Sequence, residues 1–187
     1  MIHKAWTIEV IPNYNSSVMT RTLSTEMTPA NIANVLELLA ETPTRLEGLS
    51  KSLPADQLRQ PPGKGERTPS EVLAHLINGE ARSAEMIYQA LLVKEPFFAD
   101  IHPDRNWGKL TRFDLLEFSE LVAYFTIRRK VLLRVLSGLK ESDWSRAVRE
   151  EGKQRKESVY WRARTIVMHE LDHLADLDKK LNHKGKQ

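Results

Sequence analysis

Apolar residues recur at intervals of three and four along four long stretches of this chain, which is the period of an amphipathic helix. The first stretch follows Thr28, an N-cap residue, and Pro29, which suits the first helical position. Pro43 lies within it and should kink the helix, because proline lacks a backbone donor and clashes with the preceding turn. We therefore predict a bent helix that ends near Lys51.

The second stretch has the clearest start signal in the chain. Thr68 can act as the N-cap, Pro69 follows it, and the carboxylate of Glu71 can reach back to the backbone amide of the cap residue. Apolar positions continue to about Val93, ahead of Pro96. The pattern predicts a capping box and a helix over residues 69–93.

The second half of the chain predicts two more helices. Residues 112–139 keep the helical period for seven turns, and residues 159–181 form the last helix. No stretch convincingly predicts a core strand. The fold class is therefore all-α, a four-helix bundle with a long crossover between helices two and three. The predicted connections are residues 54–66, with one turn near Leu58, the crossover at 95–110, and a charged loop at 150–157.

The length of 187 residues fits one domain. Residues 27–182 are predicted to form the bundle, and residues 1–26, which include a strand-like piece at 6–11, an extension outside its core. Residues 183–187 are predicted to be a basic tail.

Composition narrows the classes of function. The chain has no cysteine, which excludes disulfides, thiolate metal sites and a cysteine nucleophile. No apolar run approaches the roughly 20 residues that span a bilayer, so we expect a cytoplasmic protein without a membrane partner. The net charge of +3 is not concentrated on one helix face, which argues against a nucleic-acid partner.

Three of the six histidines fall inside predicted helices. His169 and His173 are four residues apart, so they share one helix face, and His75 on the second helix can complete a three-histidine set. Imidazole suits zinc, nickel, copper or iron, and three protein ligands with one open position are typical of a catalytic site. The alternative is that these histidines are structural; His3, His102 and His183 are assigned to the surface or loops.

Residues 169–173 also match the His-Glu-x-x-His pattern of zinc metalloproteases. The extended form of that pattern requires glycine at position 176 and histidine at 179, where this chain has Asp176 and Lys179. The other common form requires a more distant glutamate, and only fourteen residues follow His173. The protease hypothesis is therefore the weaker one.

The sequence resembles the DinB-like superfamily of metal-binding four-helix bundles over about residues 27–182. The resemblance rests on two runs, residues 68–76 with Glu80, and residues 167–174. It implies that His75, His169 and His173 bind one divalent metal, with zinc preferred and nickel, iron or manganese as alternatives. Many members have tryptophan where this chain has Arg67, a difference that would alter the rim of the pocket.

The resemblance implies an enzyme that acts on a small-molecule substrate, by metal-dependent hydrolysis or by transfer of a low-molecular-weight thiol such as bacillithiol or mycothiol. Such a thiol would be a cosubstrate, and a homodimer is expected. Glu170 and Asp172 are candidate catalytic groups that could support the metal ligands or face solvent, as could Glu80. The alternative functions are a stress-related binding protein with a structural metal and, from charge alone, a nucleic-acid-associated protein.

Overall fold

The computed structural model describes the backbone of residues 23–184 and the side chains of residues 23–181. The strand-like piece predicted at residues 6–11 lies outside this range, as do residues 185–187 of the predicted basic tail. None of the helices within the described range has the length and apolar character needed to cross a membrane.

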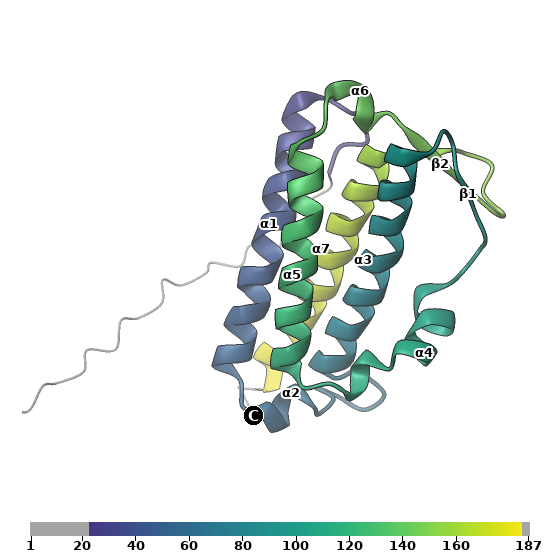
Figure 1. Cartoon of the computed structure of the whole chain (residues 1–187). Coiled ribbons are helices and arrows are strands. Elements are labelled where there is room, and N and C mark those ends of the chain that lie inside the picture. The colour runs from purple at the N-terminus through teal and green to yellow at the C-terminus, as the bar shows by residue number, and fades with distance from the viewer. Residues whose placement is uncertain (1–22, 185–187) are drawn as a thin grey trace, which may run out of the picture.

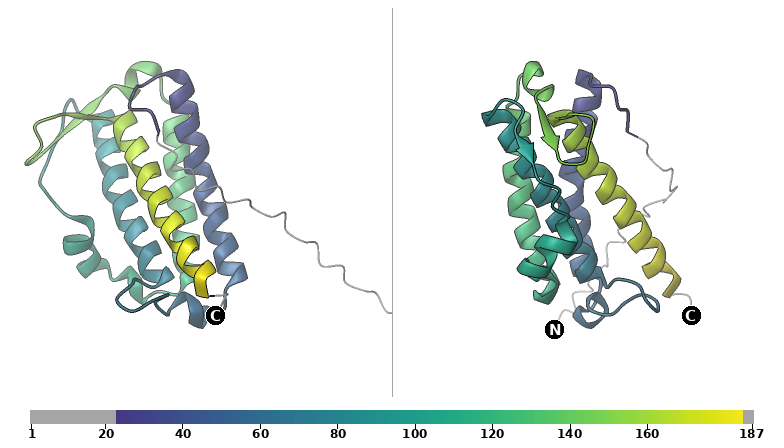
Figure 2. Two further views of the ribbon diagram at one scale, coloured as in Figure 1. Left: turned by 180° about the vertical axis from the view of Figure 1, so that it is seen from behind. Right: turned by 90° about the vertical axis from the view of Figure 1, so that its right-hand side faces the viewer.

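Within these residues, four long helices form the bundle that the sequence predicts (Figure 1). They are α1 (Pro29–Ser52), α3 (Pro69–Leu92), α5 (Phe118–Ser137) and α7 (Val159–Lys184). Helices α1 and α3 each pack against both α5 and α7. Figures 1 and 2 show that α3 and α5 run in the same direction, opposite to α1 and α7. Two parallel neighbours need a connection that returns along the bundle, which explains the long crossover between α3 and α5.

The helix starts match their sequence signals. Thr28 Oγ1 accepts a hydrogen bond from the Asn31 amide at 3.2 Å at the start of α1. At α3, Thr68 Oγ1 accepts from the Glu71 amide at 3.1 Å, and the Thr68 amide donates to Glu71 Oε2 at 2.7 Å. The predicted capping box is confirmed, and α1 continues through Pro43 to Ser52. The predicted turn near Leu58 is α2 (Ala55–Leu58).

The predicted start of the third helix at residue 112 is wrong. Arg112 adopts a left-handed conformation with φ 46°, and α5 begins only at Phe118, after the N-cap Glu117. A bulky residue with positive φ cannot continue a right-handed helix, so the apolar residues at 113–116 only mimic its period. The crossover instead contains the short helical segments η1 (Pro103–Gly108), α4 (Lys109–Thr111) and η2 (Phe113–Leu115).

A small sheet lies beside one end of the bundle (Figure 1). Strand β1 (Phe97–Phe98) pairs in parallel with β2 (Ala147–Glu150), which pairs antiparallel with β3 (Glu157–Ser158). The short helix α6 (Glu141–Trp144) precedes it. Phe98 and Val148 are buried in the main hydrophobic cluster, so the expectation of a core without strands is wrong here. Strands of two to four residues are too short to show the alternation that identifies a strand in a sequence.

A polar layer divides the core between two hydrophobic clusters. We call Thr42, Glu80, Arg129 and Glu170 the Arg129 layer; one residue comes from each long helix, and all four are buried. Along each helix, residues before and after the layer position belong to different clusters, such as Phe125 and Leu132 on α5. The layer therefore crosses the whole bundle.

Arg129 holds this layer together. Its guanidinium donates to Glu80 Oε2 at 2.7 Å, to the Leu39 carbonyl at 2.7 Å, and to both oxygens of Glu170. Thr42 Oγ1 donates to Glu170 Oε2 at 2.9 Å. Burial alone lowers the pKa of Arg129, but the charges of Glu170 and Glu80 outweigh it and raise the pKa above its usual range. Arg129 is therefore a permanent buried cation.

The bundle also includes residues on the N-terminal side of the predicted domain boundary at residue 26. Leu23 is 4% exposed and belongs to the main hydrophobic cluster. The Leu23 carbonyl accepts from Arg164 Nη2 at 2.7 Å, and the Ser24 carbonyl accepts from the Tyr160 hydroxyl at 2.9 Å. Residues 23 and 24 are thus packed against α7.

Leu23→Ala should lower the free energy of unfolding by about 2–4 kcal/mol, because it removes a buried side chain and leaves a cavity. The measurement is urea denaturation followed by circular dichroism. Leu92→Ala is the matched control, since Leu92 is 79% exposed and its removal should change stability by less than about 0.5 kcal/mol. Equal effects of the two substitutions would show that the segment before Met27 contributes nothing to the core.

Candidate metal centre

The three predicted histidines meet on the contact between α3 and α7. His75 lies in the second turn of α3, and His169 and His173 lie one turn apart on α7. His75 Nε2 is 2.7 Å from His169 Nε2 and 2.9 Å from His173 Nε2. One ligand atom from each residue lies within 4.8 Å of the others. The convergence predicted from the i, i+4 spacing is confirmed.

The chemistry of this donor set fits a divalent metal. The rings stand edge to face, with interplanar angles of 69–82°, and His75 Nε2 lies close to the Nε2 atoms of both other rings. Lone pairs that face one another repel unless a cation or shared protons lie between them. Zn–N bonds of about 2.0–2.1 Å in a tetrahedral site place the nitrogens roughly 3.3 Å apart, so separations of about half an ångström more would accommodate the ion.

Asp104 on the crossover orients the first ligand. His75 Nδ1 lies 2.6 Å from Asp104 Oδ2. This contact places the imidazole proton on Nδ1 and leaves the lone pair of Nε2 free to bind a metal. Arg67 Nη2 donates to the same carboxylate oxygen at 3.2 Å. Burial raises the pKa of Asp104, but the hydrogen bond and charge of His75, together with Arg67, outweigh it and lower the pKa. Asp104 is therefore an anion that is fixed against the ligand.

The crossover is seated on α3 close to this contact. Thr111 Oγ1 donates to Asn78 Oδ1 at 3.4 Å, and a Cβ at Gly108 would lie 3.2 Å from Asn78 Nδ2. Asn78 is buried and stands one turn after His75 on α3. This local docking holds the segment that carries Asp104 beside His75.

The other two ligands are held in the neutral form that a metal requires. Burial, together with the charges of the neighbouring histidines, lowers the pKa of His169 to about 4. Burial, followed by the charges of His75 and Arg67, also lowers the pKa of His173. Both imidazoles therefore present a lone pair at neutral pH.

Gly79 makes room for His169. A Cβ built at Gly79 would lie 3.0 Å from His169 Cε1 and 3.3 Å from His169 Nδ1. The imidazole therefore rests directly on the backbone of α3, one turn after His75. A side chain at position 79 would push the ring out of line with the other two ligands.

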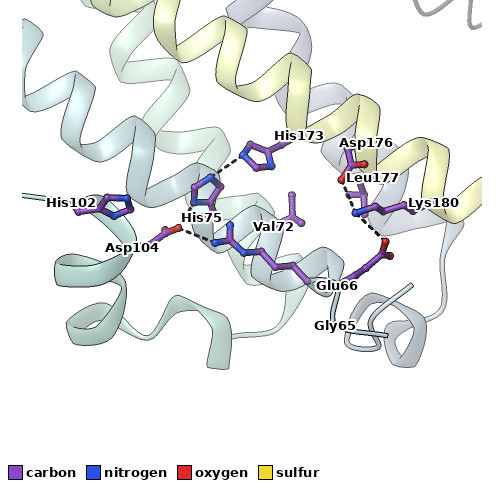
Figure 3. A pocket seen from close by; sticks show the side chains of 11 residues that line it. Gly65, Glu66, Val72, His75, His102, Asp104, His173, Asp176, Leu177 and Lys180 are labelled. Atoms are coloured by element: carbon purple, nitrogen blue, oxygen red, sulfur yellow. Dashed lines mark hydrogen bonds and ion pairs between the residues drawn. The ribbon is translucent and has the colours of Figure 1, made fainter. Parts of the chain in front are cut away.

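The site opens into a pocket of about 540 Å³. His75 and His173 line it and face each other, with Asp104 beside His75 (Figure 3). On another wall, Lys180 Nζ lies 3.3 Å from Glu66 Oε1 and 2.8 Å from Asp176 Oδ2. The pocket combines charged groups of both signs with two apolar side chains, Val72 and Leu177.

The remaining predicted residues lie in different surroundings. Glu170 and Glu80 belong to the buried Arg129 layer. Asp172 is exposed on α7. His102 lines the pocket, and its Nδ1 accepts a hydrogen bond from the Arg105 amide. Arg67 lies at the pocket, as the resemblance implies.

This geometry argues against the metalloprotease hypothesis. Its general base would be Glu170, whose carboxylate is held by Arg129 and Thr42 inside the core. The third histidine comes from α3, upstream of the pair, rather than from the residues downstream of it. Sequence reasoning missed Asp104, which lies two residues after His102 in a segment predicted only as a loop; no periodic pattern singles it out.

Comparison with known proteins agrees with the fold. The family model described as the DinB superfamily matches residues 38–177. Among solved structures, the chain is similar to YfiT from Bacillus subtilis, described as "a probable metal-dependent hydrolase with an unusual four-helix bundle topology". The TM-score is 0.77 at 17% sequence identity, over 87% of this chain and 92% of YfiT. A search of curated proteins finds no match.

Asp104→Asn should weaken metal binding by about 10- to 100-fold, the usual effect of losing the carboxylate partner of a histidine ligand. The amide oxygen can accept the hydrogen bond from His75 Nδ1–H but lacks the negative charge. The measurement is competition with a chromogenic zinc chelator. Asp172→Asn is the matched control, since Asp172 is exposed; equal affinities of all three proteins would contradict the role of Asp104.

Gly79→Ala should lower metal affinity by at least about 10-fold, because the new methyl group displaces the His169 ring. Alanine normally stabilises a helix by about 0.5–1 kcal/mol relative to glycine. Gly48→Ala in α1 provides the control, because a Cβ there meets nothing within 4 Å. It should raise the unfolding midpoint and leave metal affinity unchanged. Unchanged affinity in Gly79→Ala would contradict the close contact.

Proposed function

Because this chain belongs to the DinB superfamily, we propose that it is a metal-dependent enzyme that hydrolyses a small molecule at one divalent ion held by His75, His169 and His173. The observation that carries the proposal is the approach of His75 Nε2 to the Nε2 atoms of His169 and His173, beside an open pocket that His75 and His173 line. Three nitrogen ligands leave a coordination position for substrate or water, and the pocket gives access to it.

The donor set favours zinc. All three ligands are imidazole nitrogens, which suit zinc, nickel and iron better than the oxygen-preferring manganese. A bound ion would supply Lewis-acid chemistry and would favour the deprotonated form of a water or thiol. The chain holds the ligand geometry through Asp104 at His75 Nδ1 and through the seat of His169 on Gly79.

The walls of the pocket supply the groups that would bind a substrate. Arg67 and Lys180 can donate to anionic groups, whereas Glu66 and Asp176 can accept from cationic or hydroxyl groups. A volume of about 540 Å³ accommodates a metabolite-sized molecule rather than a folded protein. Transfer of a low-molecular-weight thiol would use the same open position, and the assay described below separates the two reactions.

A second candidate is a binding protein with a structural metal. Its support is that the ligands join α3 to α7 and that His169 does not line the pocket. This candidate predicts that chelation lowers the unfolding midpoint strongly while no substrate reaches the ion. Catalysis instead requires a coordination position on the metal at which water and substrate can exchange.

His169→Ala and His75→Ala should each reduce bound metal from about one equivalent to little or none, measured by plasma mass spectrometry on untagged protein. Circular dichroism should show that both variants keep their helices. His102→Ala is the matched control, because His102 lines the same pocket on the crossover but lies outside the ligand set. Full metal retention in His169→Ala would contradict the site.

The reaction is tested on the metal-loaded protein with panels of ester, amide and phosphoester substrates, and separately with electrophiles plus small thiols. Hydrolysis that is lost in His169→Ala and restored to chelated wild type by zinc would support the proposal. Turnover only in the presence of a thiol would replace hydrolysis with thiol transfer. Stoichiometric metal without turnover, and with a strong loss of stability on chelation, would favour the structural candidate.

A further inference from the structure

The Arg129 layer lies at the same level of the bundle as the seat of His169. Glu170 directly follows His169 on α7, and Glu80 directly follows Gly79 on α3. His169 contacts Gly79, while Arg129 bridges Glu170 and Glu80. On each of the two helices, two adjacent residues make the two contacts. The distance between α3 and α7 in the Arg129 layer therefore also sets the distance between His169 and Gly79.

From this arrangement we infer that Arg129 is a positioning residue for the three-histidine site. It fixes the spacing and register of α3 against α7, and these in turn bring His75 to His169 and His173. The inference rests on the proposed metal binding by these residues and extends it to a helix that contributes no ligand.

Electrostatics makes Arg129 necessary for the close approach. Glu80 is 2% exposed and Glu170 is 1% exposed, so their carboxylates face each other out of reach of water. Two unpaired anions in such surroundings repel strongly, and each carries a large desolvation cost. Arg129 lies between them with hydrogen bonds to both, and Arg128 Nε lies 3.4 Å from the other oxygen of Glu80. Without this bridge, α3 and α7 would separate or the carboxylates would take up protons.

The shape of the guanidinium also matters. Its planar fork reaches Glu80, Glu170 and the Leu39 carbonyl at once. A lysine ammonium keeps the charge but cannot span the same three acceptors. Arg129→Lys therefore removes the geometry of the bridge while leaving the layer with the same net charge.

The hydrophobic clusters on either side of the Arg129 layer fix the register of α7 against α3 less narrowly than the layer does. Hydrophobic side chains of similar size tolerate repacking, whereas buried polar groups are satisfied only where donors meet acceptors. A shift of α7 by one turn along α3 would separate Glu170 from Arg129 and also move His169 away from Gly79. Both contacts therefore favour the same register.

The test uses Co²⁺ as a spectroscopic probe of the full-length protein. Its visible absorption reports the number and geometry of ligands, and titration gives the affinity. Arg129→Lys should bind Co²⁺ about 10- to 100-fold more weakly, with shifted bands, as expected when support of metal ligands is removed. Arg134→Lys is the matched control on α5, because Arg134 is exposed, and it should behave as wild type.

A purely structural role of Arg129 predicts a different result. The metal-free Arg129→Lys protein would then unfold more easily, but its folded form would bind Co²⁺ with unchanged affinity and spectrum, and this outcome would overturn the inference. A wild type that binds no Co²⁺, Zn²⁺ or Ni²⁺ would instead refute the proposed function itself.

Thr42→Val provides a milder second variant if Arg129→Lys fails to fold. It removes only the hydrogen bond from Thr42 to Glu170, on the side of the layer away from Glu80. The expected change is a loss of affinity of about 2- to 5-fold, with a small shift of the bands. Wild-type affinity and spectrum in this variant would count against the inference in the same way.

Discussion

The close approach of α3 and α7 is the constraint on which the site depends. The imidazole of His169 on α7 contacts the backbone of α3 because Gly79 has no side chain. The next residue on each helix, Glu170 and Glu80, forms an ion pair with Arg129. The capping box at Thr68 fixes where α3 begins, which determines that His75 stands in its second turn. The ligand geometry thus follows from backbone placement as much as from the histidines.

The buried charges of the Arg129 layer are a specificity device rather than a main source of stability. Burying ion pairs usually gains little over an apolar core of the same volume, because desolvation offsets the attraction. Two large hydrophobic clusters on either side of the layer supply the free energy of folding. What the layer adds is a requirement that all four long helices meet at one level. A metal site tolerates errors of only a few tenths of an ångström, so such a requirement is useful next to it.

Much of this arrangement could be predicted from the sequence, because it follows from local rules. Thr68, Pro69 and Glu71 identify the start of α3, and the spacing of His169 and His173 places them on one face of α7. The start of α5 was not predictable in this way, because the apolar period continues through the left-handed Arg112 and the extended residues Leu116 and Glu117. Asp104 and the partners of Glu170 depend on contacts between distant segments, which no spacing along the chain records. The same holds for β1, whose partner strand lies about fifty residues further on.

The topology also determines when the site can form during folding. His75 is separated from His169 by 94 residues and from His173 by 98, so closing these contacts requires nearly the whole bundle to be in place. The entropy of closing so long a loop must be overcome before the ligands can meet. An ion bound by these residues would therefore have no template in the early chain, and it would select the finished topology from among compact states. A bound metal would then mark a molecule that has completed folding. When metal is scarce, the metal-free bundle would persist for longer, whereas collapse of the chain would be unaffected.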